Sequence, residues 1–298
     1  MDEEKIKELK IVKKLGHGVY GHVFLIEDQN KKRKIAKVCR KKDARWLQRE
    51  ISVLKTISHK NIITYYDTFY TKMEGIPSHF SDCFFTAEFI EGCNCSQYLI
   101  KLDYIPDEIL WGFIENISDA LIYLKNEEII HRDIKLQNIM KTESGFKLID
   151  FGFAYKISDE ISFTTSYGTP LYLAPEIISG LNYTYASDIW AFGVTIYNMV
   201  TKNQPFDSRD IVSLKRKILL GKYEKLIGPF GNLIERIFLQ NPFERITSIQ
   251  IKEIAKENLN GLLNPDLTDL FLIPELKIVN DFPLENNPIL DNCDEILT

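Results

Sequence analysis

The stretch that decides the fold is His131-Arg-Asp-Ile-Lys-Leu-Gln-Asn138, in the middle part of the 298-residue chain. Asp150-Phe-Gly152 begins twelve residues after Asn138, and Ala174-Pro-Glu176 follows later. Charged and amide side chains in this order and at these intervals do not come together by chance. The centre of the chain is therefore the first place to expect chemistry.

A glycine-rich stretch, Gly16-His-Gly-Val-Tyr-Gly-His-Val23, lies upstream of this centre. Glycines at these spacings let the backbone approach a phosphate chain, so that its N–H groups cover the phosphates. The same spacing opens a helix in dinucleotide sites, but here the apolar run Val23-Phe-Leu-Ile26 predicts a strand. The context favours a glycine-rich hairpin over a phosphate, and a plain glycine turn is the alternative.

Lys37 lies in the apolar run Ile35-Ala-Lys-Val38. A lysine in such a strand is costly unless it is paired or reaches solvent. Glu50, on a predicted helix, is the candidate partner, and together they would present the ammonium to phosphates. The alternatives are a surface lysine and a solvated glutamate.

Together these motifs resemble the eukaryotic protein kinase family over residues 9–260. Lys135 and the segment Gly168–Glu176 are similar to the serine/threonine branch. The resemblance implies an α+β, two-lobed kinase fold, with a small antiparallel β-sheet lobe plus one helix over 9–88 and a larger, mainly helical lobe over 93–260. It assigns no subfamily.

The pattern of apolar residues agrees with this division. Short apolar runs predict strands over 9–15, 23–27, 34–39, 64–69 and 83–90, with a helix over 45–57 and a loop over 71–82. After Gly92, apolar stripes predict helices over 107–125, 187–201, 214–220, 233–239 and 248–256. Two such lobes are expected to enclose a cleft.

The resemblance also implies roles for individual residues. Asp133 is expected to orient the substrate hydroxyl and accept its proton, and Lys135 to neutralise the transferring phosphoryl group. Asn138 and Asp150 are expected to hold two Mg²⁺ ions, which prefer oxygen ligands. The residues expected around ATP are Leu15, Gly16, His17, Gly18, Val19, Tyr20, Gly21, His22, Val23, Lys37, Glu50, Glu88, Ile90 and Met140.

Four features depart from the family pattern. Ala87 stands at the gatekeeper position behind the adenine, where larger residues are commoner. Ile35 replaces a small alanine above the adenine, and Gln137 replaces a glutamate common in kinases that prefer basic substrates. The interval from Lys37 to Glu50 is short, which predicts a truncated or tilted helix.

Further roles concern support and regulation. His131 is expected to be structural, and Arg245 is expected to pair with Glu176. Arg132 precedes the catalytic aspartate, as in kinases that are switched by phosphorylation of the activation loop. Spacing favours Thr165 as the activating phosphosite, and an unmodified polar loop is the alternative.

Composition excludes several other classes of protein. The net charge is −5, with an acidic tail over 264–298 at −7 and a remainder near neutral, so a nucleic-acid binder is not expected. No run of about 18 apolar residues predicts a membrane span, and the charged first ten residues do not resemble a secretory signal. Five cysteines without a zinc or disulfide spacing indicate a reducing compartment. An intracellular protein is expected, in the cytoplasm, with the nucleus also open.

The sequence therefore predicts a serine/threonine protein kinase that uses ATP and Mg²⁺. Its expected partners are protein substrates and an upstream activating kinase. A pseudokinase scaffold, which binds partners without turnover, is one alternative, and a small-molecule kinase is another.

Overall fold

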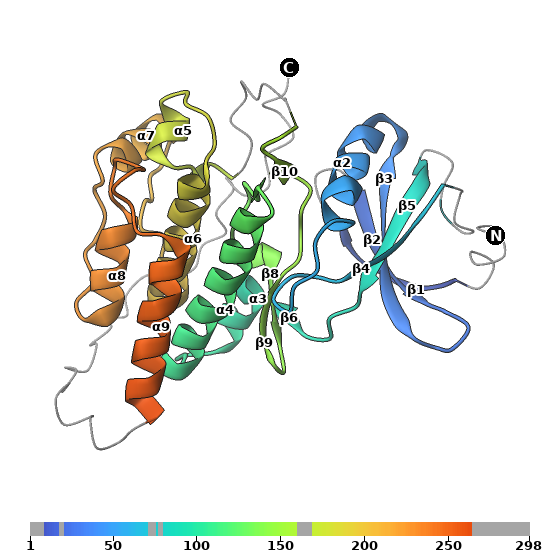
Figure 1. The fold of residues 1–298 in the computed structure, drawn as a ribbon, viewed down its shortest axis with the longest axis horizontal. Coiled ribbons are helices and arrows are strands. Elements are labelled where there is room, and N and C mark those ends of the chain that lie inside the picture. Colours follow the sequence, from blue (N-terminus) through green and yellow to red (C-terminus); the bar gives the residue numbers. More distant parts are fainter. Residues whose placement is uncertain (1–8, 18–20, 71–75, 77–79, 160–168, 264–298) are drawn as a thin grey trace.

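A computed structural model describes residues 9–17, 21–70, 76, 80–159 and 169–263. Two lobes stand side by side, one built mainly of strands and one mainly of helices (Figure 1). Within the described residues, no helix is both long and apolar enough to cross a membrane.

The small lobe is built on one antiparallel sheet with the strand order β1-β2-β3-β5-β4. Its strands are β1 (Lys10–His17), β2 (Gly21–Glu27), β3 (Arg33–Arg40), β4 (Tyr65–Phe69) and β5 (Phe80–Glu88). Aromatic and β-branched residues are frequent in β2 and β5, as suits a pleated surface that is covered on both faces. A small separate core comprises Ile26, Ala36, Val38, Phe69, Ile76, Phe80 and Phe84.

One helix, α2 (Ala44–Leu54), packs on the sheet after the short turn η1 (Lys41–Asp43). Leu47, Ile51 and Leu54 recur at helical spacing and form its buried face. Glu50 lies among them with only 3% of its surface exposed. A charged residue is rarely buried unless it is paired, so α2 carries a carboxylate that needs a partner.

The large lobe is organised around α6 (Tyr185–Thr201), which is buried from Ser187 to Met199. The other helices are α3 (Cys95–Lys101), α4 (Asp107–Asn126), α5 (Pro175–Ile178), α7 (Ile211–Leu219), α8 (Pro229–Ile237) and α9 (Ser248–Leu263). The helices α4 and α9 pack along each other (Figure 1). Lys252, early in α9, binds Asp119, late in α4, so the two helices run in opposite directions.

Short strands and turns carry the segments that face the small lobe. The strands are β6 (Cys93–Asn94), β7 (Ile129–Ile130), β8 (Ile139–Thr142), β9 (Gly145–Leu148) and β10 (Tyr155–Lys156), with turns η2 (Leu136–Asn138) and η3 (Pro170–Tyr172). They form a β6-β8-β9 sheet and a β10-β7 pair. The β10-β7 pair joins the two ends of the segment of residues 131–154, and the β8–β9 hairpin lies within this segment.

Every strand and helix expected from the apolar pattern has a counterpart within a few residues. Five boundaries differ by three residues or more: α2 ends at Leu54, β5 begins at Phe80 inside the expected loop, α7 begins at Ile211, α8 begins at Pro229, and α9 continues to Leu263. Phe80 joins β5 because it pairs with Arg40 and buries its ring. The helices α3 and α5 and the five short strands were not predicted, since none is long enough to repeat its hydrophobic period several times.

Candidate functional site

A cleft of about 400 Å³ lies between the two lobes. Residues of β1, β2, β3, α2 and β5 line it from one side, and residues near β6 and β8 line it from the other. The full lining is Leu15, Gly16, Val23, Ile35, Lys37, Glu50, Ile63, Phe85, Glu88, Phe89, Ile90, Gly92, Asn94, Gln97, Met140, Ile149 and Asp150. The cleft therefore joins an apolar chamber to a cluster of charges.

Many residues expected around ATP meet in this cleft. They are Leu15, Gly16, Val23, Lys37, Glu50, Glu88, Ile90 and Met140. Gly18, Val19, Tyr20 and the side chain of His17 lie outside the described residues.

Gly21 and His22 are not in the lining. A Cβ on Gly21 would lie 2.5 Å from the carbonyl oxygen of Val38, so glycine permits the approach of β2 to β3, and the His22 ring packs against Phe80.

Several lining residues were missed in the sequence: Ile63, Phe85, Phe89, Gly92, Asn94, Gln97 and Ile149. Strand alternation could have identified Phe85, which lies two residues before Ala87 and on the same face. Asn94 and Gln97 form a capping box at the start of α3, with Asn94 Oδ1 accepting from Gln97 N at 2.9 Å. That local signature could have revealed both residues.

Lys37 joins the two lobes through two carboxylates. Its Nζ lies 2.7 Å from Glu50 Oε1 and 2.9 Å from Asp150 Oδ1. Asp150 Oδ1 also accepts from the backbone N–H of Gly152 at 3.0 Å. The short interval between Lys37 and Glu50 therefore does not prevent their pairing, because α2 starts directly after η1.

Burial and neighbouring charges shift the pKa values of Lys37, Asp150 and Glu50 in opposite directions. Burial opposes the charge of Lys37, but Asp150 and Glu50 outweigh it and raise its pKa. Burial would raise the pKa of Asp150, yet the charge and hydrogen bond of Lys37 outweigh it and lower the pKa to about 2. For Glu50, burial dominates over Lys37 and raises the pKa to about 7. Lys37 and Asp150 are therefore charged at neutral pH.

A second polar group surrounds Asp133. Its Oδ2 lies 2.9 Å from Lys135 Nζ and accepts from Asn138 Nδ2 at 2.7 Å. Lys135 Nζ also donates to Thr169 Oγ1 at 3.1 Å. Burial raises the pKa of Asp133, and the charge of Lys135 opposes this shift. The arrangement holds one carboxylate beside an ammonium group and a hydroxyl.

Asp188, at the start of α6, fixes the backbone that carries Asp133. Its two carboxylate oxygens accept from the N–H groups of His131 and Arg132, each at 2.8 Å. Arg132 has a φ of 69°, a left-handed conformation that costs energy for a residue with a side chain. Burial raises the pKa of Asp188 to about 6, although both N–H bonds oppose this. Asp188 thus holds a strained turn in place.

His131 is fully buried against Phe151, with ring centroids 4.8 Å apart. Its Nδ1 accepts from the N–H of Asp133 at 3.2 Å. Burial lowers the pKa of His131 to about 4, so the ring is neutral at pH 7.

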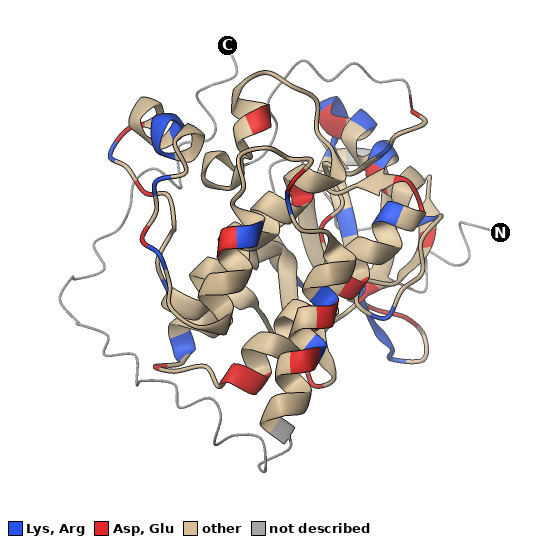
Figure 2. Ribbon diagram, turned by 60° about the vertical axis from the view of Figure 1, so that its left-hand side comes forward, with Lys and Arg blue, Asp and Glu red and all other residues tan. Residues whose placement is uncertain are grey.

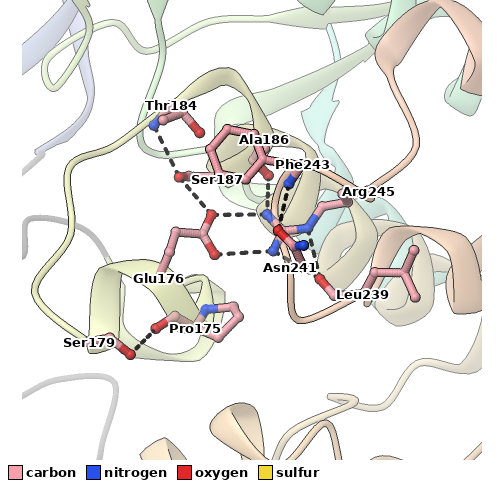
Figure 3. A network of polar contacts seen from close by, with 10 residues as sticks. All are labelled: Pro175, Glu176, Ser179, Thr184, Ala186, Ser187, Leu239, Asn241, Phe243 and Arg245. Atoms are coloured by element: carbon pink, nitrogen blue, oxygen red, sulfur yellow. Dashed lines mark hydrogen bonds and ion pairs between the residues drawn. The ribbon is translucent and has the colours of Figure 1, made fainter.

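The expected pair of Glu176 and Arg245 is present and buried (Figure 3). Arg245 Nη1 lies 2.9 Å from Glu176 Oε1, and Nη2 lies 3.1 Å from Oε2. The guanidinium also donates to the carbonyl oxygens of Ala186 and Leu239. This two-point contact ties α5 to the loop before α9.

Arg132, the residue expected to bind a phosphate on the activation loop, packs against two tyrosine rings. The Arg132 guanidinium lies 4.6 Å from the ring of Tyr183 and 5.4 Å from that of Tyr155. Thr165, the predicted phosphosite, lies outside the described residues.

Ala87 is fully buried and stands directly opposite Ile35 in the β3–β5 ladder, so both side chains lie on the same face of the sheet.

Oxygen atoms suited to a divalent cation are present on Asn138 and Asp150. The amide nitrogen of Asn138 is engaged with Asp133, so the amide oxygen is the atom that can ligate. The Asp150 carboxylate carries charge at neutral pH. One carboxylate and one amide oxygen form a donor set that a hard cation accepts when phosphate oxygens and water complete it.

The comparisons with known proteins agree with this geometry. The model of the protein kinase domain family matches residues 9–259. The chain is 33% identical over 298 residues to the carbon catabolite-derepressing protein kinase of Saccharomyces cerevisiae, covering 96% of this chain and 45% of the yeast protein. It is 30% identical over 271 residues to the serine/threonine-protein kinase Nek5 of Mus musculus, covering 86% and 42%.

A third relative is the serine/threonine-protein kinase ATG1a of Arabidopsis thaliana, 30% identical over 213 residues, with 67% of this chain and 33% of the plant protein covered. The chain thus spans less than half the length of these three curated relatives. A family match over most of the chain, together with the two-lobed fold, shows that the chain belongs to the protein kinase domain family.

Proposed function

We propose that this chain is a serine/threonine protein kinase, which transfers the γ-phosphoryl group of MgATP to a hydroxyl group of a protein substrate. The observation that carries the proposal is the proximity of two polar groups, Lys37–Glu50–Asp150 in the lining of the cleft and Asp133–Lys135–Asn138 beside it. The N–H of Ile149, next to Asp150, donates to the carbonyl oxygen of Asn138 at 3.0 Å, and the charge of Asp150 contributes to the raised pKa of Asp133. Phosphoryl transfer depends on positioning and on neutralising charge. Both groups are suited to these two tasks.

ATP binding is assigned to the apolar chamber and its charged end. Val23 and Met140 would enclose the adenine ring from opposite lobes, and Lys37 would bind the α and β phosphates. The Glu50 carboxylate, 2.7 Å away, fixes the ammonium in place before the nucleotide arrives. Such preorganisation avoids an ordering cost during the reaction.

Asn138 and Asp150 are assigned as the ligands of Mg²⁺, which supplies charge neutralisation on the phosphates when it is bound. Asp133 would orient the substrate hydroxyl and accept its proton. Lys135, held by Asp133 and Thr169, would face the transferring group. Thr169 also connects this centre to the segment leading to Glu176, where a protein substrate would lie.

A pseudokinase scaffold remains the second candidate, with a small-molecule kinase as the third. The scaffold is disfavoured because Lys37, Asp133 and Asp150 are all present and two of them are already paired. We further propose that phosphate on Thr165 would bind near Arg132 and order the loop, and that an upstream kinase supplies it. An intracellular location stays a prediction from the sequence.

The test is incubation of the purified chain with labelled ATP and Mg²⁺, with and without generic protein substrates. Label on serine or threonine that is lost in Asp150→Asn, but kept in the exposed control Asp103→Asn, supports the kinase. ATP binding without any transfer, even after Thr165→Glu, favours the scaffold. Transfer that is unchanged in Asp150→Asn would overturn the assignment of Asp150.

A further inference from the structure

A second cavity, of about 170 Å³, lies in the large lobe. The end of α4, the start of α6 and the loop between α8 and α9 enclose it. Its apolar walls are Leu121, Leu124, Ile129, Ile189 and Ile246. A cavity of about 150 Å³ accommodates a benzene molecule, so this one is large enough for a single aromatic ring.

Two apolar side chains at or beside the mouth of this cavity are exposed to water. The Phe243 side chain, in the lining, is 96% exposed, and Ile249, next to the lining residue Ser248, is 50% exposed. The exposed Lys125 adds one positive charge, with its ammonium 6.0 Å from the ring of Tyr185. Exposed apolar residues that rim an apolar cavity indicate a surface that another chain segment covers.

The chain itself contains a segment of suitable chemistry. Residues 264–298 carry eight acidic residues and one basic residue, yet they include the apolar run Leu270-Phe-Leu-Ile273. Acidic residues flank the run, with Asp269 before it and Glu275 shortly after it. Such a segment combines an aromatic ring for the cavity with negative charge for Lys125.

The length of the connection matches the distance to be covered. The helix α9 has 16 residues, so its length is about 24 Å at about 1.5 Å per residue. The cavity lies at its first turn, where Ser248 is in the lining, and the helix ends at Leu263. Phe271 comes eight residues later, which is about 26–29 Å of extended chain. Only a nearly fully extended return along α9 is therefore long enough to bring Phe271 to the cavity.

We propose that the run Leu270–Ile273 docks on the large lobe of the same chain, with the Phe271 ring in the cavity beside Phe243. Residues 264–269 run back along α9, and Asp269 or Glu275 lies near Lys125. Acidic and basic residues are mixed along α9 itself (Figure 2). The apolar contact at the cavity, rather than attraction along the helix, therefore fixes the segment.

The docked segment would lie close to the support of the catalytic loop. Asp188 lines the cavity and holds the backbone N–H groups of His131 and Arg132. A ring in the cavity packs behind that carboxylate and limits its motion. Docking is therefore expected to slow hydrogen exchange of the amide groups of residues 131 and 132.

Disulfide trapping in the full chain tests this proposal. Leu272→Cys, in a Cys293→Ser background, is combined with either Ile249→Cys or Asn260→Cys. Residues 249 and 260 are both exposed, and their separation of eleven places them on the same face of α9. An undocked tail would favour residue 260, which lies within one turn of the end of α9 at Leu263, whereas residue 249 lies about 21 Å back along the rigid helix. A docked tail favours residue 249 by roughly tenfold or more.

Peptide mapping under mild oxidation measures the ratio of the two cross-links within one chain. Phe271→Ser, added to both pairs, should restore the preference for residue 260, whereas Phe282→Ser should not. In chains without the added cysteines, Phe271→Ser should speed hydrogen exchange of residues 131–132 and 239–251, and Phe282→Ser should leave it unchanged. A preference for residue 260 in the unsubstituted tail, or cross-links mainly between two chains, would overturn the proposal.

Discussion

Lys37 contacts one carboxylate from each lobe, with Nζ at 2.7 Å from Glu50 Oε1 on α2 and at 2.9 Å from Asp150 Oδ1 in the large lobe. The position of α2 is therefore coupled to the charged end of the cleft. A displacement of α2 would remove one of the two bonds that orient the ammonium. Charge-assisted hydrogen bonds of this kind are stronger than neutral ones.

Replacing the α2 carboxylate should impair catalysis more than folding. Glu50→Gln keeps an acceptor but removes the carboxylate beside Lys37, so at pH 8, above the Glu50 pKa of about 7, we expect kcat to fall on the order of 10²-fold, as for other misplaced groups. The matched control is Glu91→Gln, whose side chain is 80% exposed and lies 3.6 Å from Arg33. Steady-state rates of both variants measure the effect, and equal rates would show that Glu50 does not position Lys37.

The buried pair of Arg245 and Glu176 should dominate the stability of the large lobe. Arg245→Ala leaves Glu176, only 5% exposed, without its partner. Breaking a buried pair costs about 3–5 kcal/mol in the free energy of unfolding. Lys225→Ala breaks the exposed pair with Glu235, which is worth about 0–1 kcal/mol. Urea unfolding compares the two, and similar losses would contradict the assigned role of Arg245.

The parts of the fold and the site that could be predicted are those whose evidence lies in neighbouring residues of the sequence. Asp133, Asn138 and Asp150 stand in short motifs, so their side chains could be named from neighbours in the sequence. Long helices such as α4 and α6 show several hydrophobic periods. Ile63 and Phe89 give no local sign that they line the cleft, because their positions depend on how the two lobes meet. The two-residue strands β7 and β10 could not be predicted either, because each forms only by pairing with the other.

His131 should make stability fall in mild acid. Its pKa in the folded chain is lowered to about 4 by burial, so the unfolded chain binds the proton first as the pH falls below 6.5. The linked loss, complete near pH 4, is roughly 3 kcal/mol in the free energy of unfolding. His131→Phe should remove this part of the pH dependence. Unfolding curves between pH 4 and 7 measure it, and parallel curves for both proteins would exclude His131 as the cause.

Ala87 should control which purines enter the cleft. Its small side chain lies opposite Ile35, on the face of the sheet that Ile35 turns to the cleft. We expect ATP with a benzyl group on N6 to be used by the chain and excluded by Ala87→Met, because the longer side chain fills the space beyond the adenine. ATP itself should keep its KM within about fivefold, or about 1 kcal/mol, since the longer side chain fills space that the unsubstituted adenine does not occupy.

Ile35 offers the complementary change in the same pocket. If Ile35 rather than Ala87 limits the space, Ile35→Ala should admit the benzyl analogue better, while Ala87→Met should have no effect. Measuring kcat/KM for both nucleotides with both variants separates these cases. Equal use of the analogue by the chain and by Ala87→Met would show that residue 87 does not border the purine.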